Sequence, residues 1–171
     1  AARAVATTAR KEIDAALELA VQALEESRRA ISDLLPPALE DLGLVPSLEE
    51  LAARVTGDGS VQVAVRAGGD LNIPPPVALV LYRVTQEALV NAAKYAQAAS
   101  IEITVDGGPE EVSLIIADDG IGFDLAQALQ IRPGATYGLA GMRERVEIAR
   151  GSFRITTSPG EGTRIDARIP R

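Results

Sequence analysis

Apolar residues recur at alternating spacings of four and three along the first 35 residues of the chain. The positions of this seam are Ile13, Leu17, Ala20, Leu24, Ser27, Ile31 and Leu34. The stretch holds no glycine or proline before Pro36 and Pro37, which cannot continue a helix. We therefore predict one long helix over 1–35 whose seam meets a partner helix. Packing on the chain's own core is the alternative.

Beyond residue 60 the apolar period changes to two, which is typical of half-buried strands. Val61, Val63 and Val65 alternate with Gln62 and Ala64 in the first of these segments. Further strands are predicted over 100–106, 111–118, 152–158 and 163–169, and helices over 77–97 and 138–150. Because this order does not suit a doubly wound parallel sheet, it predicts an α/β two-layer sandwich. The sheet is mixed with helices on one face, and the long N-terminal helix precedes it.

Three segments divide the chain: a helix over 1–36, a linker with a short helix over 37–58, and the main domain over 59–171. Ser47 and Glu50 have the spacing of a capping box, which predicts that the short helix begins at Ser47. In the main domain, the polar loop from Asp119 to Thr136 is long for a compact fold. We expect such a loop to be functional or mobile.

Composition removes several classes of function. The chain has no cysteine and no histidine, which excludes disulfides, Cys/His zinc sites and histidine-dependent triads. Any metal must be a hard ion on oxygen ligands, with Mg²⁺ as the leading candidate. The net charge of −7 disfavours nucleic acid and anionic membranes as partners. No apolar run approaches the roughly 20 residues that span a bilayer, so we expect a cytoplasmic location.

The 77–97 helix carries two stripes of different chemistry. The apolar stripe, expected to be buried, consists of Val77, Leu81, Val84, Ala88 and Ala92. Arg83, Glu87, Asn91 and Lys94 form a polar stripe beside it. An amide between a carboxylate and an ammonium group suits Mg²⁺ and polyphosphate. A solvent-exposed stripe with an Arg83–Glu87 ion pair is the alternative.

Three glycine-containing segments follow in the main domain. Asp118, Gly120 and Gly122 leave a strand, where a carboxylate can accept a hydrogen bond from an exocyclic amine. The segment Gly138-Leu139-Ala140-Gly141-Met142 opens a helix, whose free amides suit phosphate. Gly160, Gly162 and Thr163 form a predicted hairpin turn with a spare hydroxyl group. Each segment alone is equally compatible with an ordinary turn or cap.

Together and in this order, the four segments resemble the Bergerat-fold ATP-binding domain shared by sensor histidine kinases, gyrase and related ATPases. The motif sequences are most similar to those of kinases that pair with NarL-type response regulators. The stretches that carry the resemblance are LYRVTQEALVNAAKYAQA, IADDGIGF, YGLAGMRERVEIARG and SPGEGTRIDARIP, together with the linker LLPPALEDLGLVPSLEELA. The resemblance covers about residues 15–170.

The resemblance assigns roles to the helix residues. Asn91 would ligate Mg²⁺, and Lys94 would meet the phosphates. Glu87 would orient a water or assist proton removal, as a catalytic residue that also lies at the metal. Tyr95 would lie beside the nucleotide, at a position where this subfamily more often has histidine.

The remaining segments would complete an ATP site. The resemblance implies that Asp118 accepts a hydrogen bond from the adenine amino group and that Thr163 supports the adenine from the sheet. The loop 123–137 would be the ATP lid. The remaining cofactor-binding residues implied are Gly120, Gly122, Gly138, Leu139, Gly141 and Met142.

The implied function is the ATP-binding catalytic domain of a two-component sensor histidine kinase. Residues 1–36 resemble the second helix of a dimerisation domain whose first helix carries the phosphoacceptor histidine, so we expect a homodimer through 1–35. Since the chain has no histidine, self-phosphorylation is not expected. The phosphate would pass to a NarL-type response regulator. A cytoplasmic location fits, including the cytoplasmic part of a membrane-anchored bacterial sensor.

Two alternatives of other classes remain. One is an ATP-gated or degenerate nucleotide-binding module that docks partners. The presence of Glu87, Asn91 and Asp118 argues against a degenerate site. The other is a serine kinase of the same fold, as among anti-sigma factors, although the linker after residue 35 is more similar to the sensor kinases.

Overall fold

The computed structural model describes residues 36–55, 61–131 and 137–171. The chain divides into two units, and all the described elements belong to the second, Pro37–Arg171. The predicted helix over 1–35, with its seam and its role in dimerisation, lies outside the described residues.

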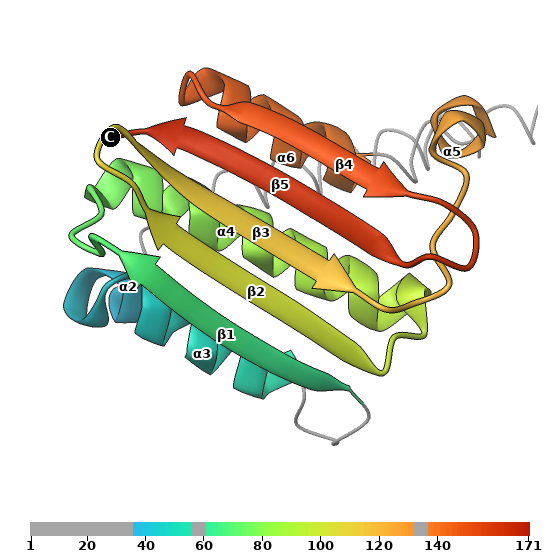
Figure 1. Ribbon diagram of the computed structural model, residues 1–171, viewed down its shortest axis with the longest axis horizontal. Helices are drawn as coiled ribbons and strands as arrows, with labels where there is room; N and C mark the ends of the chain where they lie inside the picture. The colour runs from blue at the N-terminus through green and yellow to red at the C-terminus, as the bar shows by residue number, and fades with distance from the viewer. Residues whose placement is uncertain (1–35, 56–60, 132–136) are drawn as a thin grey trace, which may run out of the picture. The chain divides into compact units, whose positions relative to one another are not determined.

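A five-stranded sheet forms one layer of this unit (Figure 1). Its strands are β1 (Gln62–Gly69), β2 (Ser100–Gly107), β3 (Glu111–Asp118), β4 (Ser152–Thr157) and β5 (Thr163–Pro170). The strand order is β1-β2-β3-β5-β4, with β1 parallel to β2 and every other pair antiparallel. The predicted mixed sheet is therefore confirmed.

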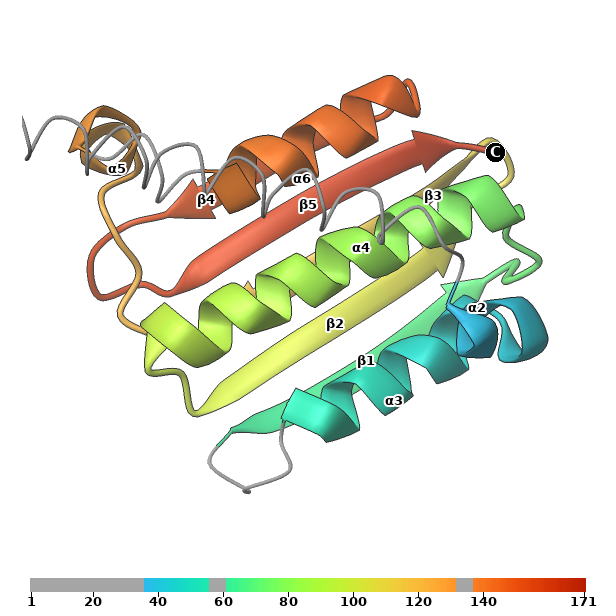
Figure 2. The same ribbon diagram turned by 180° about the vertical axis from the view of Figure 1, so that it is seen from behind.

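Helices form the second layer. The helices of the unit are α2 (Pro37–Leu42), α3 (Leu44–Val55), α4 (Pro75–Asn91), α5 (Leu125–Ile131) and α6 (Tyr137–Ile148), with a π-helical turn η1 (Ala92–Ala96), and α5 lies beyond the end of the sheet. Helices α3, α4 and α6 lie across one face of the sheet, and Figure 2 shows them in front of it. The opposite face, seen in Figure 1, carries no helix of the described unit. The predicted arrangement of helices on one face is confirmed.

The core lies between these two layers. Leu81 and Val84 of α4 are fully buried, as are Ile103, Val105 and Leu114 of the two central strands. The apolar stripe predicted for the 77–97 helix is confirmed, because all five of its residues, four on α4 and one on η1, are buried. Burial alternates along β2 and β3, so every second residue faces the helices, as period-two patterning requires.

The helix predicted to begin at Ser47 begins earlier. Helix α3 starts at Leu44, and Ser47 is buried within its first turn, where its hydroxyl donates to the Gly43 carbonyl at 2.7 Å. The capping-box prediction is therefore wrong. Pro46 does not delay the helix, because an amide in the first turn has no partner within the helix.

Two further local differences concern the main domain. The helix predicted to run to Gln97 changes to π-helical geometry at Ala92 and ends where Gln97 adopts a left-handed conformation (φ 51°). Helix α5 lies inside the segment predicted as a loop, and its start is capped by Asp124, whose carboxylate accepts the Gln127 amide at 2.9 Å.

Candidate functional site

The polar stripe of α4 presents an amide and a carboxylate one turn apart. The Asn91 Nδ2 atom donates to Glu87 Oε1 at 3.3 Å, and both side chains are half-buried. Because this bond engages the amide nitrogen, the amide oxygen of Asn91 faces away from Glu87. Among the described residues that oxygen accepts no hydrogen bond, so it is available to a ligand.

The start of α6 meets this pair. A Cβ atom built on Gly138 would overlap Glu87 Oε1 and would lie 3.4 Å from Asn91 Nδ2. Any side chain at Gly138 would therefore push Glu87 aside. The fold thus joins two of the predicted segments, which are separated by about 50 residues in sequence.

The loop after β3 closes on the end of η1. The half-buried Asp118 accepts the Gly120 amide on Oδ1 at 3.0 Å, which forms a tight turn. Gly120 is buried against Ala96, and the Ile121 amide donates to the Ala96 carbonyl at 2.8 Å. Asp118 is therefore held on a loop that is anchored to the segment carrying Lys94.

The turn between β4 and β5 lies against the same loop. The Gly160 amide donates to the Ile121 carbonyl at 2.7 Å, and Cβ atoms built on Gly122 or Gly162 would overlap backbone oxygens across this contact. Thr163 is paired with Asp118 in the β3–β5 ladder. A hollow of about 160 Å³ lies here, with Asp118 and Thr163 in its lining.

Two residues that organise the site were missed by sequence reasoning. The first is Asp119, whose Oδ1 accepts the amides of Ala99 at 2.8 Å and Ser100 at 2.9 Å, and whose Oδ2 accepts the Ser100 hydroxyl at 2.8 Å. The Ser100 amide and then its hydroxyl lower the pKa of Asp119, because they bind its charged form. No local sequence signal links Asp119 to Ala99 and Ser100, which precede it by 20 and 19 positions.

The second is Thr157 at the end of β4. Its hydroxyl accepts the Phe123 amide at 3.1 Å, donates to the Gly162 carbonyl at 2.9 Å and lies 3.3 Å from the Thr163 hydroxyl. This one side chain therefore ties the loop after β3 to the β4–β5 turn. A threonine at a strand end carries no signal of such a role in the sequence.

The other predicted residues differ in exposure. Lys94 and Tyr95 lie on η1 and are exposed, Tyr95 by 68%. Leu139 and Gly141 are partly exposed on the first turns of α6. Met142 is fully buried, so its side chain belongs to the core and is not open to a cofactor.

Magnesium is compatible with the side chains at this place. The described residues hold no cluster of three or more acidic, histidine or cysteine side chains, so a metal here would need ligands from outside the protein. Mg²⁺ commonly binds through one or two protein oxygens together with phosphates and waters. Asn91 Oδ1 and the neighbouring Glu87 carboxylate match that modest requirement.

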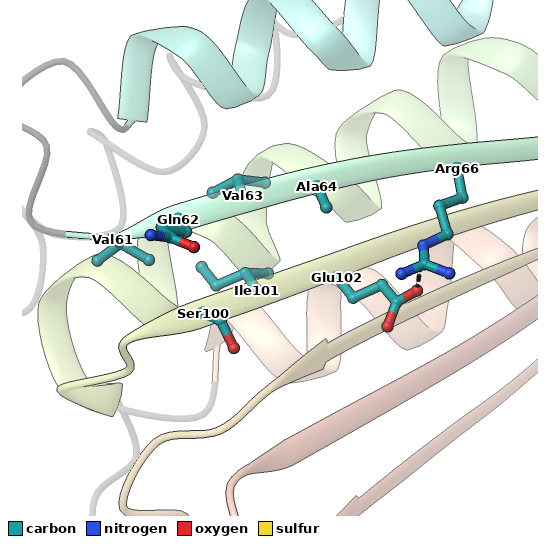
Figure 3. A pocket seen from close by; sticks show the side chains of 8 residues that line it. All are labelled: Val61, Gln62, Val63, Ala64, Arg66, Ser100, Ile101 and Glu102. Carbon is teal, nitrogen blue, oxygen red and sulfur yellow. Dashed lines mark ion pairs between the residues drawn. The ribbon is translucent and has the colours of Figure 1, made fainter.

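A larger hollow of about 490 Å³ lies along β1 and β2. Figure 3 shows its lining, including an ion pair in which Arg66 Nε lies 2.7 Å from Glu102 Oε1. None of the predicted site residues lines it. Within the described part of the chain, no helix is both long enough and apolar enough to span a bilayer.

Comparison with protein families identifies the domain. Residues 77–171, more than half of the chain, match the family described as histidine kinase-, DNA gyrase B- and HSP90-like ATPases. The chain belongs to this ATPase family. The match includes every predicted site residue from Glu87 to Thr163.

Similar curated members of this ATPase family are sensor kinases. The chain is 34% identical over 161 residues to the signal transduction histidine-protein kinase/phosphatase DegS of Brevibacillus brevis, covering 94% of this chain and 41% of that protein. It is 38% identical over 139 residues to DegS of Bacillus subtilis, covering 79% of this chain and 36% of that protein. The sensor histidine kinase ComP of B. subtilis is 34% identical over 144 residues, covering 84% and 18%. The chain thus spans less than half the length of these relatives.

Solved structures support the fold. The histidine kinase domain of the blue-light activated kinase EL346 from Erythrobacter litoralis matches with a TM-score of 0.56 and 22% identity, over 74% of this chain and 60% of that one. The mycobacterial sensor histidine kinase MprB matches with a TM-score of 0.55 and 21% identity, over 73% of this chain and 92% of that one. The fold predicted from the motifs is confirmed.

Proposed function

We propose that this domain binds ATP with Mg²⁺ and delivers the γ-phosphate to a histidine on another segment, for relay to a response regulator. The observation that carries the proposal is the convergence of the four motifs. Gly138 lies against Glu87 and Asn91, and the Asp118 loop lies against both Ala96 and the β4–β5 turn.

Asp118 and Thr163 form the base-binding part of the proposed site. An ionised carboxylate only accepts hydrogen bonds, so Asp118 suits an exocyclic amino group such as that of adenine. Its bond from the Gly120 amide fixes the carboxylate on Oδ1 and leaves Oδ2 for the base. The buried Gly120 keeps the loop pressed on Ala96 and so holds Asp118 in place.

Asn91, Glu87 and Lys94 form the phosphate-binding part. Asn91 would hold Mg²⁺ through its amide oxygen, with Glu87 alongside, and Lys94 would neutralise phosphate charge. The metal supplies charge neutralisation on the transferring phosphoryl group. Phosphoryl transfer needs little covalent chemistry from the protein, so these residues act by positioning and charge. The first turns of α6, with Gly138, Leu139 and Gly141, would face the same phosphates.

The phosphate acceptor must come from elsewhere, because the chain contains no histidine. The relatives that share this domain carry the name histidine kinase and are more than twice as long as the shared segment. We infer that the acceptor helix belongs to a two-helix dimerisation domain of which 1–35 supplies the second helix. A NarL-type response regulator would receive the phosphate.

Labelled ATP tests this function. A longer polypeptide that adds the residues encoded immediately upstream should become labelled, and the label should be lost in acid and kept in base, as a phosphohistidine requires. The matched control is the same polypeptide with Asn91→Ala, which should remain unlabelled. Acid-stable label would contradict the proposal and would indicate a serine or threonine kinase of the same fold.

A further inference from the structure

The Thr157 hydroxyl contacts three polar atoms of the proposed base site. It lies 3.1 Å from the Phe123 amide nitrogen, 2.9 Å from the Gly162 carbonyl oxygen and 3.3 Å from the Thr163 hydroxyl oxygen. Distance alone does not say which of the two hydroxyls donates to the other. The two remaining contacts settle that question.

A hydroxyl has one proton to donate and two lone pairs that accept. The Gly162 carbonyl can only accept, so it takes the Thr157 proton. The Phe123 amide can only donate, so it occupies one lone pair of Thr157. The contact with Thr163 is left with the second lone pair, and Thr163 must therefore be the donor.

This assignment determines what Thr163 can offer a ligand. Its single proton is committed to Thr157, so toward the hollow it presents only lone pairs. Its neighbour across the β3–β5 ladder is Asp118, and both residues line the hollow of about 160 Å³. A carboxylate also presents only lone pairs. Two adjacent acceptors match an amino group, which has two N–H donors, and repel a carbonyl oxygen.

We propose that Thr157 is a positioning residue that fixes Thr163 as an acceptor and thereby makes the base site select 6-amino purines over 6-oxo purines. This inference rests on the proposed nucleotide site and adds its specificity determinant. Without the Thr157 hydroxyl, Thr163 would be free to rotate and donate to an oxo group. Selectivity would then fall while the site still bound nucleotide.

Calorimetric titration with ADP and with IDP tests the proposal. IDP carries an oxo group where ADP carries the amino group, has N1–H where ADP has a free N1 lone pair, and lacks the extra amino group of GDP, so the pair confines the change to the 6-position and the adjoining N1. Thr157→Val removes the hydroxyl at nearly constant volume and keeps a β-branched side chain. We expect the preference for ADP over IDP to fall about 3- to 10-fold, which corresponds to one neutral hydrogen bond.

Two variants separate this role from a purely structural one. Thr157→Ser restores the hydroxyl and should restore the preference for ADP. Thr104→Val makes the same change in the middle of β2, at a residue outside the lining of the hollow, and should leave the preference unchanged. Thr163→Val removes the acceptor itself and should lower the preference by a similar factor, and the double variant should lower it no further.

Each other outcome overturns the inference. If Thr157→Val weakens ADP and IDP by the same factor, Thr157 only supports the loop. An unchanged preference would show that Thr163 needs no such partner. If Thr157→Val does not fold, the Thr163→Val preference decides, and no change there excludes Thr163 as a base acceptor. Wild-type protein that binds neither nucleotide would instead overturn the proposed function itself.

Discussion

The two ends of the candidate site differ in how much the protein itself holds in place. At the proposed base end, Asp119 and Thr157 form hydrogen bonds with residues distant in sequence, and Asp118 accepts the Gly120 amide within its own turn. At the phosphate end, Lys94 is exposed on a π-helical turn, and Asn91 has one long hydrogen bond to Glu87. The base end is preorganised, whereas the phosphate end relies on what binds there.

The chemistry of the proposed nucleotide ligand would account for this difference. An uncharged base is recognised by short-range, directional hydrogen bonds, so its acceptors must be fixed before binding. Phosphates and Mg²⁺ are charged and act over longer distances, and the metal brings its own geometry. A side chain at the phosphate end can therefore settle around its ligand at little cost.

The largest expected effect comes from breaking the base end at Gly162. This residue has φ +68°, and a Cβ there would overlap the Asp118 carbonyl. Gly162→Ala should lower the free energy of unfolding by about 2–5 kcal/mol through backbone strain and overpacking, and should abolish ADP binding. Urea unfolding and calorimetry measure the two effects.

Gly160 offers the matched control for this substitution. It also has a positive φ, +85°, but a Cβ there would meet nothing within 4 Å. Gly160→Ala should therefore cost only the strain, about 1–2 kcal/mol, and should leave ADP affinity nearly unchanged. Equal losses for the two variants would contradict the close packing of the β4–β5 turn on Asp118.

Asp119 gives a pH-dependent way to loosen the base end. Hydrogen bonds from the Ser100 amide and hydroxyl lower its folded-state pKa, so its carboxylate stabilises the fold above its unfolded pKa of about 3.9. That contribution is lost as the pH falls through the lowered folded value. Asp119→Asn should therefore be less stable than wild type at pH 7, and the difference should shrink below about pH 4.

Thermal unfolding at a series of pH values checks this prediction. Asp106→Asn is the control, because the Asp106 side chain is exposed and makes no hydrogen bond among the described residues. It should have the same stability as wild type throughout. A stability difference for Asp119→Asn that stays constant down to the acid limit would mean that the carboxylate charge has no role there.

The smallest effect should come from outside both ends, at the Arg66–Glu102 ion pair on the open face of the sheet (Figure 3). Both side chains are largely exposed, and such pairs contribute about 0–1 kcal/mol. Arg66→Ala should change stability by no more than this and leave ADP affinity unchanged. A marked loss of nucleotide affinity would indicate that the larger hollow belongs to the site.

Sequence patterns predicted the parts of this fold that depend on periodicity. The buried stripe of α4 and the alternating strands follow from apolar spacing, which tertiary contacts reinforce. Glu87, Asn91 and Asp118 were selected from the order of their motifs along the chain, and their roles stay predictions. The π-helical turn that begins at Ala92 has no counterpart in the apolar spacing, and its last residue, Ala96, accepts the Ile121 amide from the loop after β3.

The residues that organise the base end could not be predicted. Asp119 reaches Ala99 and Ser100, and Thr157 reaches Phe123, each across 19 or more residues that only the folded sheet brings together. At Ser47 a local rule failed because the helix continues three residues further toward the N-terminus. Local propensity is a weak guide where tertiary packing decides a helix end.

The contrast between the two ends is tested most directly by measuring ADP affinity with and without Mg²⁺ for wild type, Asp118→Asn and Asn91→Ala. Asp118→Asn keeps an oxygen for the Gly120 amide, so the loop should remain folded while the base loses its acceptor. Its affinity should fall by a similar factor, at least 10-fold or about 1.4 kcal/mol, under both conditions. Asn91→Ala should lose only the part of the affinity that Mg²⁺ adds. If both variants lose affinity equally with and without Mg²⁺, or if neither loses any, the assignment of a base end and a phosphate end is wrong.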